Sequence, residues 1–312
     1  MRQLTFSPTS SLPYLPQKSR WGEVVKNRWA YLFISPFFIL FGIFGLFPIV
    51  YSFFLSFHEW NGIRPMSFVG LENYTFLFGP GGKVFWQSVL NGVILFVMYV
   101  PIMTVLALVL AVILNSQKVR FFRVFRTLIF LPWVTSMIAA GFAFQLLLAN
   151  DGGLFNTLLN SIGLASVPWL ENVAAARASL CILIMWGWLG YNMVLMLTGL
   201  QTIPAELSEA ARIDGANAIK TFFYITVPLM RPIILFSVTL STIGSFGLFN
   251  EVMALTGGGP QRATLTPLIH IYNIAFTDFK FGRASAQAYV YFALILVLTL
   301  TQFRYFGRER ED

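Results

Sequence analysis

The sequence predicts an all-α membrane protein with six transmembrane helices, and its composition and charge pattern lead to that fold class. Hydrophobic residues make up 57% of the 312-residue chain and charged residues only 11%, whereas soluble domains average about 25% charged residues. A helix needs about 20 apolar residues to cross the hydrocarbon core of a bilayer. Six stretches contain no Asp, Glu, Lys, Arg or His and are interpreted as spans: 29–57, 87–117, 127–150, 178–205, 232–250 and 284–303.

The remaining segments complete the expected domain organisation. The tail 1–28 carries five basic residues and no apolar stretch of its own, so we do not interpret it as a signal peptide. The run 232–250 is slightly short for a span, and we expect the apolar residues after Glu251 to extend it. The expected parts are an N-terminal tail, a six-helix domain and a C-terminal tail: 1–28, 29–306 and 307–312.

Lysine and arginine are distributed unequally between the two sides of the predicted spans. If the N-terminus is inside the cell, the inner segments carry 5, 4, 3 and 3 of these residues, whereas the outer segments carry 2, 1 and 3. Cytoplasmic segments of membrane proteins carry such an excess of positive charge. We therefore expect a multi-pass protein of the cell (inner) membrane with both termini, and the segment 201–231, in the cytoplasm. The net charge of +8 follows from this topology and requires no nucleic-acid partner.

The patterns that enzymes and metal sites need are absent from the sequence. Cys181 is the only cysteine and lies in an apolar run, so we interpret it as a small buried residue. His58 and His270 come without a His-Glu-x-x-His motif, and no Gly-x-Ser-x-Gly motif occurs. The stretch GPGGKVF at 79–85 lacks the first Gly and the Ser or Thr of a phosphate-binding loop. We therefore expect no catalytic, metal-binding or cofactor-binding residues and no enzyme activity in this chain.

Acidic residues are nearly absent from the apolar runs. Glu251 is the only acid near the predicted hydrocarbon, and it lies towards the outer end of its span. Ion-coupled carriers commonly keep an acid or base near the middle of the membrane to bind the driving ion. We therefore expect the energy for any uphill transport to come from another source.

A polar segment, SEAARIDGANAIKTFFYITVP at 208–228, stands between two long apolar runs. Pro204 suits the first helical position, and Glu206 favours the positive end of the helix dipole. These residues predict a first short helix over 205–213. Two interpretations remain open for the whole segment: an interfacial loop with aromatic anchors, or a docking element for a partner.

A tight corner and a second helix are expected next. Gly215 stands where a left-handed helix cap is needed, a conformation that glycine adopts without steric cost. Asn217 can cap the second helix, and Pro228 is expected to end it before the fifth span. A helix-turn-helix of this size cannot bury its own apolar face, so it needs a groove on a partner.

This segment resembles the EAA loop of binding-protein-dependent ABC importer permeases. That loop has the pattern Glu-Ala-Ala, three residues, Gly, nine residues and Ile-x-Leu-Pro. Here the matching residues are Glu209-Ala210-Ala211, Gly215, Ile225, Val227 in place of the usual Leu, and Pro228. The stretches LTGGGP at 255–260, FLPWVTS at 130–136 and WLGYN at 188–192 resemble the carbohydrate branch of this family, the maltose-type permeases. The resemblance extends over about residues 30–306.

The resemblance implies that the loop 201–229 forms coupling helices that dock into a cleft of a cytoplasmic ATPase subunit. Glu209 and Arg212 are three apart on one helical face, where they can pair with each other. We favour instead a pair between Glu209 and a basic residue of the ATPase, because the family's motif keeps the acid. The residues expected in coupling are Glu209, Ala210, Ala211, Arg212, Asp214, Gly215, Ala216, Phe222 and Pro228.

The fifth span is rich in small and hydroxyl residues, which has two interpretations. Such residues allow close helix packing, and they also supply the hydrogen-bonding groups of a sugar path. In maltose-type permeases the sugar contacts come from this stretch and from the Trp-Leu-Gly segment of the preceding span. The resemblance places them here on Leu189, Gly190, Met193, Ser241, Gly244, Ser245 and Leu248. Asn192 and Asn250 are further polar candidates on the same two spans.

The resemblance thus implies a permease subunit of an ATP-driven ABC importer, which forms half of the transmembrane pathway for a sugar or sugar derivative. The expected partners are a second homologous permease, two ATPase subunits that bind ATP and Mg²⁺, an extracytoplasmic sugar-binding protein and membrane lipid. Two alternatives remain open: a glycerol-phosphate or polyol importer of the same architecture, and a stand-alone secondary transporter or channel. A membrane-embedded enzyme is a third, which the missing motifs disfavour.

Overall fold

The computed structural model describes residues 26–115 and 121–307, and most of them are helical. Contacts divide the chain into two compact units, Met1–Ser52 and Phe53–Asp312. Residues 1–25 and 308–312 of the predicted tails lie outside the described residues. The first predicted span is confirmed as a helical stretch long and apolar enough to cross a membrane, Arg28–Leu55. It consists of α2 (Arg28–Phe41), the π-helix η1 (Gly42–Leu46) and α3 (Phe47–Leu55).

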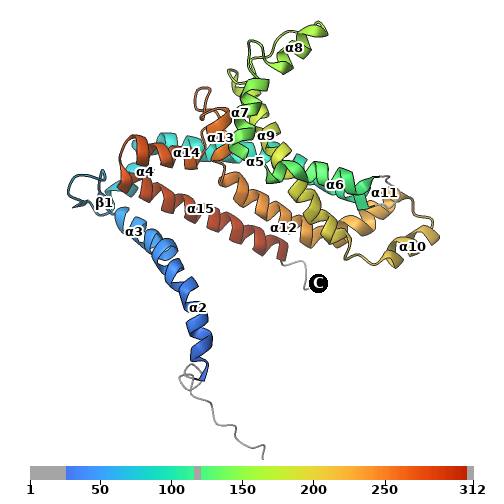
Figure 1. Cartoon of the computed structure of the whole chain (residues 1–312), viewed down its shortest axis with the longest axis horizontal. Coiled ribbons are helices and arrows are strands. Elements are labelled where there is room, and N and C mark those ends of the chain that lie inside the picture. Colours follow the sequence, from blue (N-terminus) through green and yellow to red (C-terminus); the bar gives the residue numbers. More distant parts are fainter. Residues whose placement is uncertain (1–25, 116–120, 308–312) are drawn as a thin grey trace, which may run out of the picture. The chain divides into compact units, whose positions relative to one another are not determined.

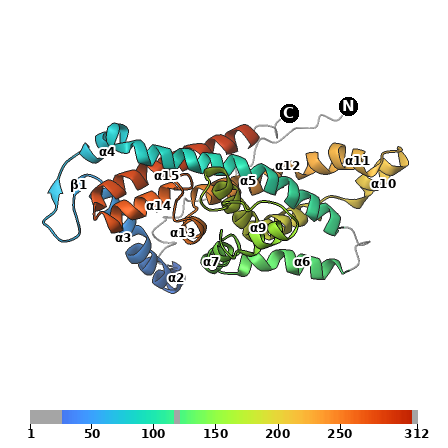
Figure 2. The same cartoon turned by 90° about the horizontal axis from the view of Figure 1, so that it is seen from above.

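The second unit contains four further helical stretches of spanning length. They are built on α5 (Lys83–Asn115), α9 (Val173–Leu200), α12 (Val227–Phe246) and α15 (Phe281–Gly307). α5, α9 and α12 pack on one another, and α15 lies against α12 (Figures 1 and 2). Their facing apolar side chains form the core of this unit, which includes Leu95, Met103, Leu180, Ile184, Met196 and Met230.

The fourth predicted span, 178–205, is displaced in the structure. α9 begins at Val173, where the Asn172 side chain caps it by accepting hydrogen bonds from the next backbone N–H groups. Arg177 lies inside the helix because its guanidinium group donates to Ala263 O at 3.0 Å. A search for charge-free runs therefore placed the start of this helix too late.

The third predicted span, 127–150, is not one straight helix, so that prediction is corrected. It comprises α6 (Phe122–Phe130), the 3-10 turn η3 (Leu131–Val134) and α7 (Met137–Leu147). The two arms meet at an angle of 97°. Pro132 lies in the first turn of η3, Thr135 is extended, and Ser136 caps α7, which interrupts the helix. The described residues thus hold five helices of spanning length, or six if this bent pair counts as one span.

The fifth predicted span also differs from the structure. α11 (Ala218–Thr221), the π-helix η4 (Phe222–Thr226) and α12 form one continuous stretch of 29 residues. Pro228 lies in the first turn of α12 and does not end a helix, contrary to the prediction. The π turn just before it, in which Val227 N–H bonds to Phe222 O, accommodates the proline.

The extension predicted beyond Glu251 is wrong. α12 ends at Phe246, and the Tyr291 hydroxyl donates to the buried carbonyl of this last residue at 2.6 Å. The apolar residues that follow form a separate short helix, α13 (Asn250–Leu255), which packs on α7.

The predicted outer segments are ordered and add a small sheet to the expected all-helical fold. β1 (His58–Glu59) pairs antiparallel with β2 (Ser67–Phe68), and the buried Asn73 side chain donates to Ser56 O and His58 O at 2.9 and 3.0 Å. The remaining elements are α4 (Glu72–Phe78), the 3-10 turn η2 (Pro80–Gly82), α8 (Leu154–Ser161), α14 (Pro267–Tyr272) and the π-helix η5 (Asn273–Thr277).

Candidate functional site

The first helix of the polar segment, α10 (Ala205–Ile213), has the predicted bounds. Pro204 precedes it as the N-cap residue, with φ −58° and ψ 134°, instead of occupying the first helical position as predicted. Glu206 lies in the first turn and Arg212 in the last. Both charges interact favourably with the helix dipole. Each such interaction stabilises an exposed helix by about 0.3–1 kcal/mol.

The corner after α10 is closed by the backbone. Gly215 has φ 81°, which confirms the predicted left-handed conformation. Gly215 N–H donates to Arg212 O at 3.1 Å, and Ala216 N–H donates to Ala211 O at 2.8 Å. This pair of bonds is a complete Schellman motif, which satisfies helix carbonyls that would otherwise lack a partner. The angle between α10 and α11 is therefore set by the backbone at one glycine.

The second helix of this hairpin is the start of a span. Asn217 caps α11 as predicted, because its Oδ1 accepts from Lys220 N–H at 2.8 Å. From there the helix continues without interruption to Phe246. Phe222 packs against the core cluster formed by α5, α9 and α12. The second helix of the hairpin and the fifth span are consequently parts of one helical stretch.

The hairpin itself is exposed and lies at the opposite end of the second unit from α4 and β1 (Figures 1 and 2). Ala211 is buried, whereas the other charged and small motif residues are open to contact. Glu209 and Arg212 are both exposed on α10. The exposed apolar side chains of the hairpin include Leu207, Ile213, Ile219, Phe223 and Tyr224.

Several residues predicted for the substrate path form a buried polar network between α9 and α12. Asn192 Oδ1 accepts from Ser237 Oγ at 2.6 Å and from Ser241 Oγ at 3.4 Å, and its Nδ2 donates to Trp188 O at 3.1 Å. Ser245 Oγ lies against the hydroxyl of Tyr99 on α5. In the chain by itself these groups therefore hold helices together.

The other predicted path residues take different positions. Gly190 is a packing residue, since a Cβ there would lie 2.1 Å from Ile129 O. Met193 and Leu248 are buried in the core clusters, while Leu189 and Gly244 are half-buried and Asn250 is exposed. The nine residues thus follow one seam of the fold along α9, the end of α12 and the start of α13, and most of them are buried.

A cluster of three aromatic rings lies beside this seam, at the break in the third span. Trp133 on η3 lies 4.5 Å from Trp188 and 4.6 Å from Tyr191, measured between ring centroids. The buried Glu251 accepts from Trp188 Nε1 at 3.4 Å, which orients that indole. All three rings are half-buried, so each keeps part of its surface accessible.

The glycine-rich stretch at 255–260 continues into a rigid loop that is tied to two distant helices. Asn91 on α5 donates to Arg262 O at 2.7 Å and to Leu265 O at 3.0 Å. Arg177 on α9 donates to Asn91 Oδ1 and to Ala263 O, both at 3.0 Å. Because Asn91 is only 2% exposed, water cannot replace these bonds.

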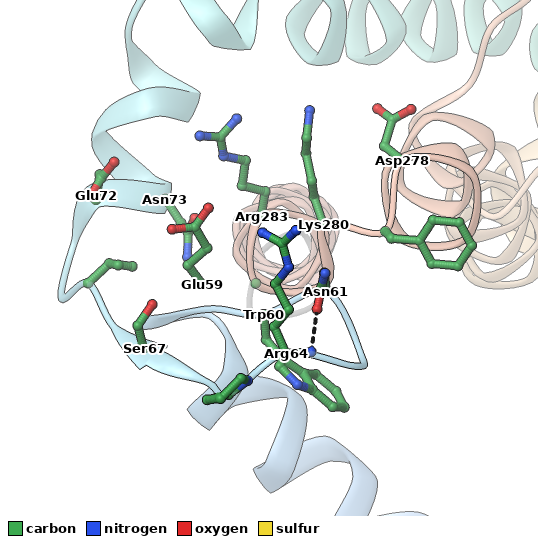
Figure 3. Close-up of a pocket in the computed structure, with 14 residues that line it drawn as sticks. Glu59, Trp60, Asn61, Arg64, Ser67, Glu72, Asn73, Asp278, Lys280 and Arg283 are labelled. Carbon is green, nitrogen blue, oxygen red and sulfur yellow. Dashed lines mark hydrogen bonds between the residues drawn. The ribbon is translucent and has the colours of Figure 1, made fainter.

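An open cleft of about 390 Å³ lies between the β1–β2 hairpin, α4 and the start of α15. Figure 3 shows Glu59 and Arg64 from the hairpin around one hollow with Lys280, just before α15, and Arg283, in its first turn. The Asn61 side chain fixes the turn below them by accepting from Arg64 N–H at 2.8 Å. This surface is polar and of mixed charge, which suits contact with a soluble partner.

No group of three or more His, Cys, Asp or Glu that could hold a metal ion occurs in residues 26–115 and 121–307. Burial, followed by the charge of Arg262, lowers the pKa of His270 below its ordinary value. His270 is therefore uncharged at neutral pH.

Residues 83–308, which run from α5 through α15, match the family described as "Binding-protein-dependent transport system inner membrane component". The chain belongs to this family. The permease is 41% identical over 290 residues to a lactose transport system permease protein of Rhizobium radiobacter, which covers 91% of this chain and 95% of the relative. It is 36% identical over 276 residues to an arabinooligosaccharides transport system permease protein of Halalkalibacterium halodurans, with 87% and 85% covered.

Solved structures share the fold of the permease. It is similar to a chain of a bacterial ABC transporter involved in the import of the acidic polysaccharide alginate, with a TM-score of 0.81 and 20% identity. That match covers 93% of this chain and 99% of the other. The same transporter in complex with an alginate pentasaccharide-bound periplasmic protein matches with a TM-score of 0.80. At this identity the likeness establishes the fold of the permease.

Sequence reasoning missed the role of three groups of residues in the permease. Trp133 and Tyr191 lie in stretches already quoted for their resemblance, but nothing local predicted that their rings stack. Asn91 reaches a loop more than 170 residues away, a contact without a local signal. Gly190, which is also a predicted residue of the substrate path, lets α9 approach the backbone of α6 because it has no side chain, a contact without a local signal.

Replacing Asn192 with leucine is expected to lower the free energy of unfolding of the permease by about 1–2 kcal/mol. The change removes the shared acceptor of Ser237 and Ser241, and hydrogen bonds between membrane helices are worth about 0.6–2 kcal/mol each. Thermal unfolding of the purified chain in detergent measures the effect. The matched change Thr198→Val, on an exposed face of α9, is expected to be nearly neutral because Thr198 bonds only to Leu195 O in its own helix. Equal effects of the two changes would contradict this account.

Proposed function

We propose that this permease forms half of the transmembrane pathway of an ATP-driven importer for a sugar or sugar derivative. The relatives named for lactose and arabinooligosaccharide transport, at 41% and 36% identity, support the substrate class. The observation that carries the mechanism is the continuous 29-residue helix Ala218–Phe246, which joins the exposed hairpin to the polar seam. A motion imposed on the hairpin is therefore delivered directly to the residues of the path.

The motor is a separate protein in this proposal. Two ATPase subunits would bind ATP and Mg²⁺, since the sequence contains no nucleotide-binding motif. The hairpin would dock on one of them through an exposed face that its own two helices cannot bury. The residues assigned to this contact are Glu209, Ala210, Ala211, Arg212, Asp214, Gly215, Ala216, Phe222 and Pro228.

The second permease and the binding protein complete the assembly. A homologous permease would supply the other half of the path. A binding protein would deliver the sugar to the outer segments, an arrangement supported by the related alginate transporter in complex with its periplasmic protein. The excess of Lys and Arg in the inner segments supports a cytoplasmic hairpin and cytoplasmic termini. ATP binding would then close the ATPases and rock the spans between outward and inward access.

The sugar path is assigned to the seam between α9 and α12. Its residues are Leu189, Gly190, Asn192, Met193, Ser241, Gly244, Ser245, Leu248 and Asn250. The half-buried rings of Trp133, Trp188 and Tyr191 extend this surface, and flat apolar rings beside polar groups are typical walls of ligand sites. The buried hydroxyls would become available to the sugar when the helices separate from one another or from the partner permease.

Replacing Trp133 with alanine is expected to raise the KM for sugar uptake about tenfold, equivalent to about 1.4 kcal/mol of lost contact. The ring is stacked on Tyr191 and half-buried, so its removal opens the proposed wall of the path. The matched change Trp29→Ala, at the exposed start of the first span, is expected to leave KM unchanged. A normal KM in Trp133→Ala would remove the aromatic cluster from the path.

Uptake by the purified complex tests the proposed function as a whole. The complex is reconstituted into vesicles with its binding protein outside and ATP with Mg²⁺ inside, and uptake of labelled lactose and arabinooligosaccharides is measured. Uptake is expected to require hydrolysable ATP and the binding protein. Uptake driven by a proton or sodium gradient without ATP would contradict the proposal and support a secondary transporter.

A further inference from the structure

A second cleft, of about 470 Å³, lies between the glycine-rich loop, η5 and the start of α15. It is separate from the seam assigned to the sugar path. Its charged or titratable lining residues are Arg262, His270, Asp278, Lys280 and Arg283, and Gln287 also lines it.

Gln287 is the first indication that this cleft receives a ligand. Its side chain is only 3% exposed, yet its Oε1 has no hydrogen-bond partner among the described residues. A buried amide oxygen without a partner costs about 1–3 kcal/mol, and nearly all such groups in folded proteins are paired. Because this oxygen is shielded from solvent in the structure, an O–H or N–H group of a bound molecule would satisfy it once the Gln287 side chain turns toward the cleft. A bare anion such as sulfate carries no donor for this oxygen.

The charge of the cleft is the second indication. Three permanent cations line it against one carboxylate, Asp278, and His270 is uncharged at neutral pH. The lining therefore carries a net positive charge. This is unusual, because the cleft lies on predicted outer segments, and the excess of Lys and Arg is expected in the inner segments. Lys280 and Arg283 also line the first cleft, whereas Arg262 lines only this one. Converging cationic side chains are typical of sites for carboxylates and phosphates.

The cations are also held in place. Arg262 has φ 63°, a left-handed conformation that costs a residue with a side chain about 1–2 kcal/mol, and its carbonyl is fixed by Asn91. Phe279, next to Lys280, has φ 54°. The Arg283 guanidinium carbon lies 4.1 Å from the centroid of the Phe76 ring, which orients this side chain. Such local backbone strain commonly marks ligand sites.

We propose that this cleft binds a sugar or polyol that carries an anionic group, either a carboxylate or a phosphate. Arg262, Lys280 and Arg283 would hold the anionic group, while a hydroxyl of the same molecule donates to Gln287 Oε1. The volume suits one such molecule, because small-ligand sites measure about 300–1,000 Å³. The proposal rests on the proposed function only for the side of the membrane from which the ligand arrives.

Binding to the full chain in lipid nanodiscs tests this site without any ATPase. The probes are glucuronate and glucose 6-phosphate, with glucose as the uncharged counterpart and sulfate as the anion without a hydroxyl donor. Isothermal titration is expected to give at least tenfold tighter binding for glucuronate or for glucose 6-phosphate than for glucose. The tighter of the two identifies the anionic group. Affinities no better than that of glucose would overturn the proposal.

Variants assign the binding to this cleft. Arg262→Gln is expected to weaken the tighter probe at least tenfold, because Arg262 lines this cleft and not the first. Gln287→Leu is expected to weaken the same probe while leaving sulfate binding unchanged, which also shows that this variant is folded. Arg64→Gln is the matched control, because Arg64 lines only the other cleft. Unchanged affinity in Arg262→Gln, or in Gln287→Leu, would overturn the proposal. ATP-driven uptake is measured separately, so failure of either proposal leaves the other testable.

Discussion

Replacing Gly215 with valine is expected to abolish ATP-driven uptake while the chain still inserts into the membrane. Gly215 has φ 81°, and a side chain with a Cβ pays about 1–2 kcal/mol in this conformation. The space around the position is open, since a Cβ there would meet no atom within 4 Å. The cost is therefore one of backbone conformation, and it falls on the corner that orients α10 against α11. Uptake into vesicles and co-purification of the ATPase measure the result.

Two controls separate a coupling defect from general damage. Gly152 also has a positive φ, 73°, and open surroundings, but it lies between α7 and α8 on a predicted outer segment. Gly152→Val is therefore expected to retain uptake. Gly215→Asn is expected to retain part of it, because asparagine tolerates the left-handed conformation better than other residues with side chains. Normal uptake and a normally bound ATPase in Gly215→Val would contradict the role assigned to this corner.

Asn91→Leu is expected to lower the free energy of unfolding of the permease by about 3 kcal/mol or more. The change leaves Arg262 O and Leu265 O without their donor and removes one acceptor of Arg177. Each buried group left unpaired costs about 1–3 kcal/mol. Thermal or chemical unfolding in detergent measures the loss, and added sensitivity of residues 255–265 to protease would locate it.

Asn160→Leu is the matched control for this change. Asn160 is exposed, and its side chain accepts one hydrogen bond, from Ser166 Oγ at 3.2 Å. A surface change of this kind is expected to stay within about 0.5 kcal/mol. Equal stability of Asn91→Leu and the native chain would show that the glycine-rich loop is held by other contacts.

The parts of the fold that the sequence predicted well are those encoded locally. Long apolar runs predicted the spans. The cap signals at Gly215 and Asn217 correctly predicted the corner of the hairpin and the start of α11. Two predictions from local signals failed because the three-dimensional surroundings of the residue decided its place. Pro228 was expected to end a helix, but a π turn before it carries the helix through. Arg177 was expected outside its span, but it lies inside α9, where its guanidinium group donates a hydrogen bond to the carbonyl of Ala263.

The candidate site was less predictable because its contacts join distant segments. The serines of α12 are suited to both packing and ligand binding, and only the position of Asn192 shows that they are bonded within the chain. The run 127–150 was predicted as one span, and nothing in the sequence predicted the 97° bend beside which Trp133 lies against Trp188. The sequence could not predict that Gln287 Oε1 lacks a hydrogen-bond partner, because this depends on which side chains the fold places around it.

Photo-crosslinking from two exposed isoleucines tests most directly whether the hairpin docks on a separate cytoplasmic ATPase subunit. Ile213 in the hairpin is 86% exposed, and Ile63 in the β1–β2 turn is 89% exposed. A photoreactive phenylalanine analogue replaces each residue in turn, in cells that contain the whole transport system. At Ile213 it is expected to crosslink to the ATPase subunit, and at Ile63 to an extracytoplasmic protein and never to the ATPase. A crosslink from Ile63 to the ATPase, or none from Ile213, would contradict the orientation and the coupling role together.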